Sequence, residues 1–252
     1  MHEIDFKYGE ALETADKIMT YKLTVKTIAK RHGLYASFMP KPKYGMCGSG
    51  MHINMSLFNK EGQNIFVDEN DKNGLSKEAY NFIAGLMKHM RSMTAIINPI
   101  VNSYKRLVPG YEAPTYIAWS ATNRSPLIRV PAARGLGTRV ELRSPDCATN
   151  PYLAIAVCLA AGLDGIKNNL QPVDSIQRDI YSMTDEERDE AGIENLPKNL
   201  YEAIQEMRKS DFVKGVLGKE VFKKYIKAKE EEWMEYTSQV TDWEIDRYLG
   251  RI

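Results

Sequence analysis

Residues 102–146 read NSYKRLVPGYEAPTYIAWSATNRSPLIRVPAARGLGTRVELRSPD, and this stretch decides the fold. It holds seven basic residues, six of them Arg, against three acidic ones. Its local charge is therefore +4, in a chain whose formal net charge is +1. An arginine guanidinium is a planar fork that binds phosphate or carboxylate through two parallel hydrogen bonds and stays charged when partly buried. The stretch therefore indicates an anion-binding site.

Polar and apolar residues alternate in the segment TRVELR near the end of this stretch. Alternate side chains of a strand point to opposite faces, so Arg139, Glu141 and Arg143 share one face while Val140 and Leu142 point into a core. Such a charged face is either a solvated surface, as on many edge strands, or the floor of a polar site.

Three other segments favour a polar site. Ile128–Pro131 places Arg129 in an apolar strand, and Arg106 precedes a loop that begins at a Pro-Gly pair. Met51–Phe58 also alternates, with His52, Asn54 and Ser56 on its polar face, as in an antiparallel sheet with one polar side. A further strand is predicted at His2–Phe6, with Glu3 facing the same way as its neighbour Asp5.

Helical periodicity and helix-end signals outline the rest of the chain. The run from Leu153 to Leu163 is apolar all round, which predicts a helix buried on every side. A buried strand is predicted at residues 34–39. Helices are predicted at residues 14–32, 76–97, 150–163, 196–207, 213–216, 220–236 and 242–248.

Composition excludes several classes of protein. The chain has 252 residues, 43% hydrophobic and 27% charged, which is ordinary for a soluble globular protein of one large domain or two small ones. A net charge of +1 makes no case for nucleic acid or an anionic membrane, and no apolar run approaches the ~20 residues of a membrane span. Three cysteines without CxxC spacing, and no signal peptide, predict a cytoplasmic location.

The polar faces suggest a metal and phosphate site. Glu3, His52 and Glu141 offer carboxylate and imidazole groups that suit Mg²⁺ or Mn²⁺ when phosphate completes the shell. Hard cations together with arginine forks are what phosphoryl transfer needs, because its catalysis rests on positioning and charge stabilisation. The residues alone leave open whether a phosphate or carboxylate site exists, and they do not specify a reaction.

Several motifs resemble those of glutamine synthetase, in that family's order: FMPKP at residues 38–42, GSGMH at 48–52, the run 102–114, NRS at 123–125 and RVELR at 139–143. The resemblance is strong from His2 to about Lys167 and looser to the end. It implies an α+β fold, a curved and mainly antiparallel sheet backed by helices, as in the catalytic domains of glutamine synthetases and guanidino kinases. Residues 3–167 would form the active-site part and 168–252 a C-terminal helical part, with the family's N-terminal β-grasp domain missing.

The resemblance also implies a role for individual residues. Glu3 would hold the metal beside glutamate, and His52 and Glu141 the metal beside the nucleotide phosphates. The substrate glutamate would be bound by Gly48, Arg106 and Arg143. Glu112 would lie on a flap that closes the site and would help to deprotonate ammonium. Arg124 would stabilise the phosphoryl group during its transfer. The residues implied at ATP are Tyr8, Ser56, Arg129 and Arg139.

The implied reaction is ATP-dependent synthesis of glutamine from glutamate and ammonia through γ-glutamyl phosphate, in an enzyme whose full-length form is a dodecamer. Cys47 stands where the family usually has Asn. Two alternatives stay open: a non-catalytic remnant of the same fold that binds nucleotide or partner subunits, and a related phosphotransferase such as a guanidino kinase.

Overall fold

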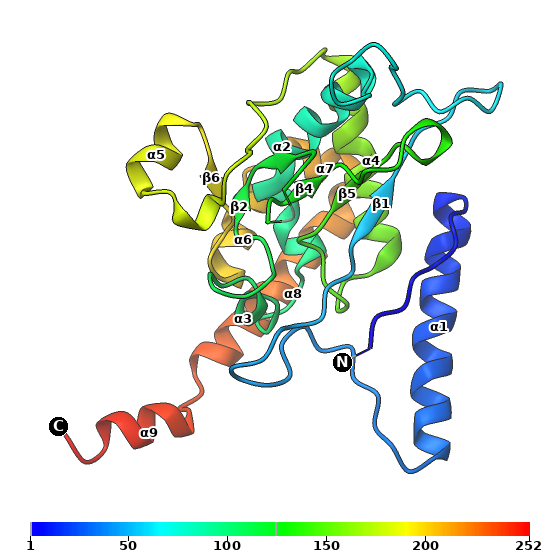
Figure 1. The fold of residues 1–252 in the computed structure, drawn as a ribbon. Helices are drawn as coiled ribbons and strands as arrows, with labels where there is room; N and C mark the ends of the chain where they lie inside the picture. The colour runs from blue at the N-terminus through cyan, green and yellow to red at the C-terminus, as the bar shows by residue number, and fades with distance from the viewer. Residues whose placement is uncertain (1, 124) are drawn as a thin grey trace.

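A computed structural model describes residues 2–123 and 125–252 of the chain. Its centre is a pair of packed helices, α2 (Lys77–Ile97) and α4 (Pro151–Lys167), which a small sheet and the C-terminal helices surround (Figure 1).

Both central helices begin where the sequence predicts. The Ser76 hydroxyl accepts a hydrogen bond from the N–H of Ala79 at 3.2 Å, which caps α2. The Asn150 side chain accepts from the N–H of Tyr152 at 3.0 Å, and Pro151 fills the first helical position of α4. Each cap satisfies a backbone donor that has no partner within the helix, so local chemistry fixes these helix starts.

Glycines let α2 and α4 approach each other backbone to backbone. A Cβ on Gly85 would lie 2.1 Å from the carbonyl oxygen of Ala161, and one on Gly165 would lie 2.0 Å from that of Asn81. Both distances are well inside van der Waals contact, so no other residue fits either position without a shift of the helices.

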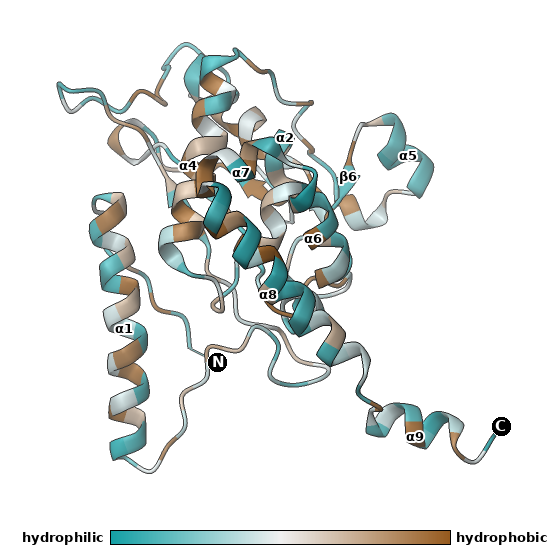
Figure 2. Ribbon diagram, turned by 180° about the vertical axis from the view of Figure 1, so that it is seen from behind, coloured by the Kyte–Doolittle hydropathy of each residue, from teal (hydrophilic) through white to brown (hydrophobic). Residues whose placement is uncertain are grey.

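The C-terminal helices pack into the same core. α6 (Leu200–Arg208) contacts α2 and α8 (Lys219–Thr237), and α7 (Asp211–Leu217) contacts α4 and α8. Leu200 and Phe222 belong to one buried cluster with the side chains of α2 and α4. In Figure 2, α4 is largely hydrophobic, whereas the outward side of α8 is largely hydrophilic. The division into parts at residue 167 stays a prediction.

The main sheet is mainly antiparallel, as predicted. Its order is β1-β5-β4-β3, with β5 antiparallel to both β1 and β4, and β3 parallel to β4. Val140 and Leu142 are fully buried, so the prediction that they point into the core is confirmed, while Glu141 between them is also buried. The strands are β1 (Ile53–Met55), β3 (Trp119–Ser120), β4 (Ile128–Arg129) and β5 (Val140–Leu142).

Shorter elements complete the fold. β2 (Tyr116–Ile117) pairs with β6 (Glu194–Asn195), which brings an arm containing α5 (Asp185–Glu190) back to the body. α9 (Asp242–Tyr248) extends away from the rest at the C-terminus (Figure 1). The remaining turns of helix are α3 (Ser103–Arg106), η1 (Gly135–Gly137) and η2 (Ile180–Ser182).

Two predicted strands are wrong. Residues 2–6 and 34–39 form no strand, and Leu34 is 68% exposed. The backbone N–H and C=O groups of a strand need hydrogen-bond partners on a neighbouring strand. Among the described residues, neither segment pairs with a strand of either sheet. The Phe6 ring instead packs edge-on against Tyr21, with ring centroids 5.3 Å apart.

The prediction that the helix after Asn150 is buried on every side is also wrong. Leu159 and Leu163 are 38% and 46% exposed, because α1 (Ala11–Arg31) covers only part of α4. The predicted helix at residues 14–32 corresponds to α1. Among the residues described, no helix is long and apolar enough to cross a membrane.

Candidate functional site

The Glu141 carboxylate is the centre of a cluster of charged side chains on the polar face of the sheet. Its Oε1 lies 3.2 Å from Nδ1 of His52 and 3.5 Å from Nε of Arg143, and its Oε2 lies 2.9 Å from Nη1 of Arg129. Strand register explains the meeting, because Glu141 stands opposite both Asn54 on β1 and Arg129 on β4. Three polar residues predicted from alternation therefore share one face with Arg129, and we call Glu141, His52, Arg129 and Arg143 the Glu141 cluster.

The surroundings of Glu141 keep it ionised. Burial alone would raise the pKa of this carboxyl group. The hydrogen bond and charge of His52, together with the charges of Arg129 and Arg143, outweigh burial and lower the pKa below its usual value. A buried carboxylate that is ionised at neutral pH can serve as a ligand for a hard cation.

Arg143 carries an unused donor. Burial lowers its pKa, which the charge of Glu141 opposes, and its Nη1 atom is buried without a hydrogen-bond partner among the described residues. A buried donor left unpaired costs about 1–3 kcal/mol, so such groups usually mark a place that a ligand or water fills. A carboxylate or phosphate oxygen fits this donor.

Arg106 lies where the predicted glutamate-binding loop meets the end of β5. It is 4% exposed, and its Nη1 and Nη2 atoms donate to the carbonyl oxygens of Ser144 and Arg143 at 2.6 and 3.1 Å. A Cβ on Gly50 would lie 2.6 Å from Nη2 of Arg106, and one on Gly48 would lie 2.9 Å from its Cγ. The structure thus brings Gly48 and Arg106 together, although main-chain carbonyls already occupy two of the five guanidinium donors.

Of the residues predicted at the nucleotide, Arg129 lies on β4 in the Glu141 cluster, and the other three lie beside β1. Arg139 donates from Nε to Oδ1 of Asn54 at 2.9 Å. The Tyr8 ring packs against Phe58, with ring centroids 5.8 Å apart, and Ser56 lies between Asn54 and Phe58 in the chain. Tyr8, Ser56 and Arg139 thus follow the β1 edge of the sheet, beside the Glu141 cluster that contains Arg129.

The other predicted site residues are less closely placed. Glu112 is exposed on the loop after α3, and its charge opposes the lowering of the Arg143 pKa by burial, so the two lie within electrostatic reach. Glu3 is exposed, and no three His, Cys, Asp or Glu side chains in the described part of the chain gather closely enough to hold a metal. His52 and Glu141 therefore supply two donors, and the role of Glu3 stays a prediction. Arg124 lies outside the described residues.

Sequence reasoning missed a buried polar network behind Arg106. Asp146 is fully buried and accepts hydrogen bonds from Nδ2 of Asn98 and the N–H of Ala148, both at 2.9 Å. Burial raises its pKa, and the bonds from Asn98 and Ser103 and the charge of Arg106 oppose that rise. The only indication of this network in the sequence was the position of Asp146, directly after Ser144 and Pro145 at the end of a predicted strand.

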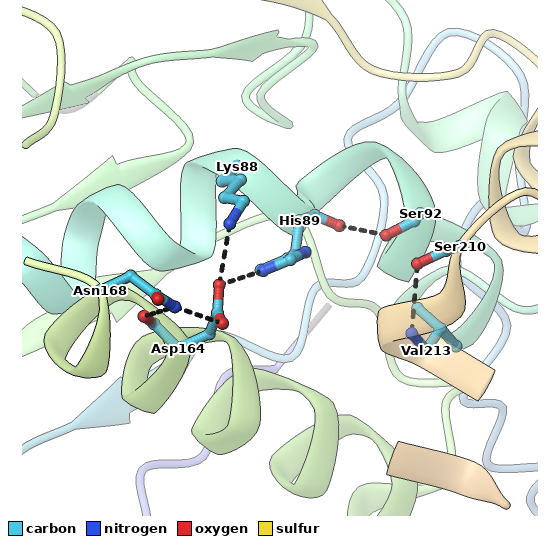
Figure 3. A network of polar contacts seen from close by, with 7 residues as sticks. All are labelled: Lys88, His89, Ser92, Asp164, Asn168, Ser210 and Val213. Atoms are coloured by element: carbon cyan, nitrogen blue, oxygen red, sulfur yellow. Dashed lines mark hydrogen bonds and ion pairs between the residues drawn. The ribbon is translucent and has the colours of Figure 1, made fainter. Parts of the chain in front are cut away.

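A second polar network ties helices together and does not reach the sheet. Nε2 of His89 lies 2.8 Å from Oδ2 of Asp164, and Nζ of Lys88 lies 3.1 Å from the same oxygen (Figure 3). The His89 ring stacks on Phe212, with centroids 3.7 Å apart. These contacts join α2, α4 and α7, so the network is structural.

Comparison with known proteins gives consistent matches. The family model for the glutamine synthetase catalytic domain matches residues 1–248. The chain is 63% identical over 250 residues to a glutamine synthetase of Clostridium saccharobutylicum, covering 99% of this chain and 56% of that protein. It is 57% identical over 251 residues to a glutamine synthetase of Methanosarcina mazei, covering 100% of this chain and 56% of that protein.

Solved structures agree with the sequence matches. A ligand-free GmaS is 40% identical with a TM-score of 0.86, covering 96% of this chain and 55% of that one. A GmaS/ADP complex is 39% identical with a TM-score of 0.87, covering 97% and 56%. The chain thus spans about half the length of the relatives it matches.

Proposed function

The chain belongs to the glutamine synthetase family, and we propose that it carries the nucleotide and glutamate side of an ATP-dependent glutamate–ammonia ligase site. The observation that carries this proposal is the Glu141 cluster, in which one buried carboxylate gathers an imidazole and two guanidinium groups, while a buried donor of Arg143 has no partner among the described residues.

Each group of residues has a proposed task. His52 and Glu141 would hold Mg²⁺ or Mn²⁺, which when bound supplies positive charge to the nucleotide phosphates. Arg129 and Arg139 would bind the phosphates, with Tyr8 and Ser56 beside the nucleotide. Gly48 and Arg106 would bind glutamate, and the free donor of Arg143 would bind a carboxylate oxygen of glutamate.

The proposed reaction proceeds in two steps. The γ-carboxylate of glutamate attacks the terminal phosphorus of ATP, which forms γ-glutamyl phosphate and releases ADP. Glu112 takes a proton from ammonium, and the resulting ammonia displaces phosphate to give glutamine. Arg124 would stabilise the phosphoryl group during transfer. Guanidinium groups suit both steps because phosphoryl and acyl transfer develop negative charge on oxygen.

A calorimetric titration of the chain with ADP, with and without Mn²⁺, tests the proposal. We expect binding that requires Mn²⁺, that Glu141→Gln abolishes and that Glu69→Gln, on an exposed turn, leaves intact. No binding by the folded chain, or binding that ignores both Mn²⁺ and the Glu141 substitution, would overturn the proposal.

The second candidate is a non-catalytic relative that binds nucleotide or partner subunits. It is favoured by the small number of metal donors that the described residues bring together. Turnover of ATP with glutamate and ammonia by the purified chain separates the two candidates. Assembly into a larger oligomer and the cytoplasmic location stay predictions.

A further inference from the structure

Lys41 connects two loops that border the candidate site. We call residues 40–50 the glycine loop, because it contains Gly48 and Gly50, and residues 107–115 the Glu112 loop. The Lys41 ammonium lies 3.5 Å from the centroid of the Tyr111 ring, next to Glu112. A cation this near a ring face interacts with the negative side of its quadrupole, and more strongly when water is excluded.

The Lys41 end of this contact is fixed. Lys41 is 9% exposed, and its ammonium also donates to the carbonyl oxygen of Met46 within the glycine loop. Its backbone is bound to the Asn102 side chain, which accepts from the N–H of Lys41 at 2.7 Å and donates to its carbonyl oxygen at 3.0 Å. The ammonium is therefore held in position before it meets the ring.

The Tyr111 side of the contact has few other interactions among the described residues. The Glu112 loop is anchored at its two ends, where Leu107 and Ala113 are buried and the Tyr181 hydroxyl donates to the carbonyl oxygen of Ala113 at 3.1 Å. Between these anchors, Gly110 has a positive φ of 86°, and among the described residues no hydrogen bond holds positions 109–112. The contact between the Lys41 ammonium and the Tyr111 ring therefore holds the tip of the Glu112 loop.

We propose that Lys41 and Tyr111 form a latch that holds the Glu112 loop against the glycine loop, so that Lys41 is a positioning residue for Glu112. This inference rests on the proposed function only because that function gives Glu112 a catalytic role. The geometry itself links the loop that presents Gly48 to the loop that presents Glu112. Filling the glycine loop with substrate would then also favour the placement of Glu112, within electrostatic reach of Arg143.

Limited proteolysis by a glutamate-specific protease tests the latch without any ligand or turnover. The measured quantity is the rate of cleavage after Glu112 divided by the rate after Glu69, which lies on an exposed turn of another loop. When opening is fast, cleavage follows the population of the open loop. A contact of this kind is worth about 0.5–2 kcal/mol, so Lys41→Met and Tyr111→Leu should each raise the ratio about 2- to 30-fold.

Two further variants make the result specific. Tyr111→Phe keeps the ring and should leave the ratio unchanged. The double variant Lys41→Met with Tyr111→Leu should match the single variants, because both remove one contact. Unchanged ratios in the single variants, a double variant whose effect is the product of the two, or a Tyr111→Phe effect equal to that of Tyr111→Leu would each overturn the latch. The ADP titration is independent of this ratio, so failure of the latch and failure of the proposed function are distinguishable.

Discussion

Replacement of Glu141 by Gln should destabilise the folded chain, because it removes the negative charge that contacts Arg129, Arg143 and His52. The side chain keeps its size, but an NH₂ donor replaces one of the two acceptor oxygens, so the change removes the charge and one acceptor. Removing one partner of a fully buried ion pair costs about 3–5 kcal/mol. The Arg129 side chain is 31% exposed and that of Arg143 only 13%, and water screens part of the interaction, so we expect about 1–3 kcal/mol.

The pH dependence gives this prediction a second readout. The folded-state pKa of Glu141 lies below its ordinary value of 4.5, so its contribution to stability is fully present above that pH and is lost as the pH falls through the folded-state pKa. The stability deficit of Glu141→Gln should therefore shrink as the pH falls below 4.5.

Urea denaturation followed by circular dichroism measures the free energy of unfolding at each pH. Glu69→Gln serves as the control and should change stability by less than about 0.5 kcal/mol, since Glu69 is exposed. A Glu141→Gln protein as stable as wild type at pH 7, or a deficit that persists unchanged at pH 3, would refute the electrostatic account of the cluster.

Three further predictions concern the core and the thiols. Gly85→Ala should destabilise by about 1–3 kcal/mol or more, since its Cβ would meet a helix backbone, whereas Gly215→Ala, with nothing within 4 Å, should be neutral or stabilising in urea melts; equal effects would contradict the close helix contact. Burial lowers the pKa of His89 below 6.5, so stability should fall as the pH drops below 6.5, and His89→Gln should flatten that slope in urea midpoints taken from pH 7.5 to 5; an unchanged slope would exclude His89 as its source. Burial raises the pKa of Cys158 to about 12, so a thiol reagent should label exposed Cys47 in the folded chain but Cys158 only after unfolding, as peptide mass spectrometry would report; early labelling of Cys158 would mean that the core opens readily.

Features set by neighbouring residues were predictable. The caps at Ser76 and Asn150 need only a side chain and the next turn of backbone, and both form as predicted. Alternation placed Glu141 on the same face as its cationic neighbours, because strand geometry fixes which side chains share a face.

Features that depend on distant residues were not predictable. The segment around Glu3 has the pattern of a strand, yet pairing requires another strand, and the sequence of the segment does not specify one. The exposure of Leu163 depends on how far α1 reaches along α4. The contact between Lys41 and Tyr111 joins loops far apart in the chain, and no spacing rule connects them.

The register of the main sheet has a consequence for the order of folding. Arg139 and Asn54 are 85 positions apart in sequence, so joining β1 to β5 closes a long loop, whereas each helix forms from local contacts. The polar face should therefore assemble late, after α2 has begun to collapse with its neighbours. Interactions absent from the transition state act mainly on the unfolding rate. A ligand that binds this face of the folded chain would accordingly slow unfolding and leave the folding rate nearly unchanged.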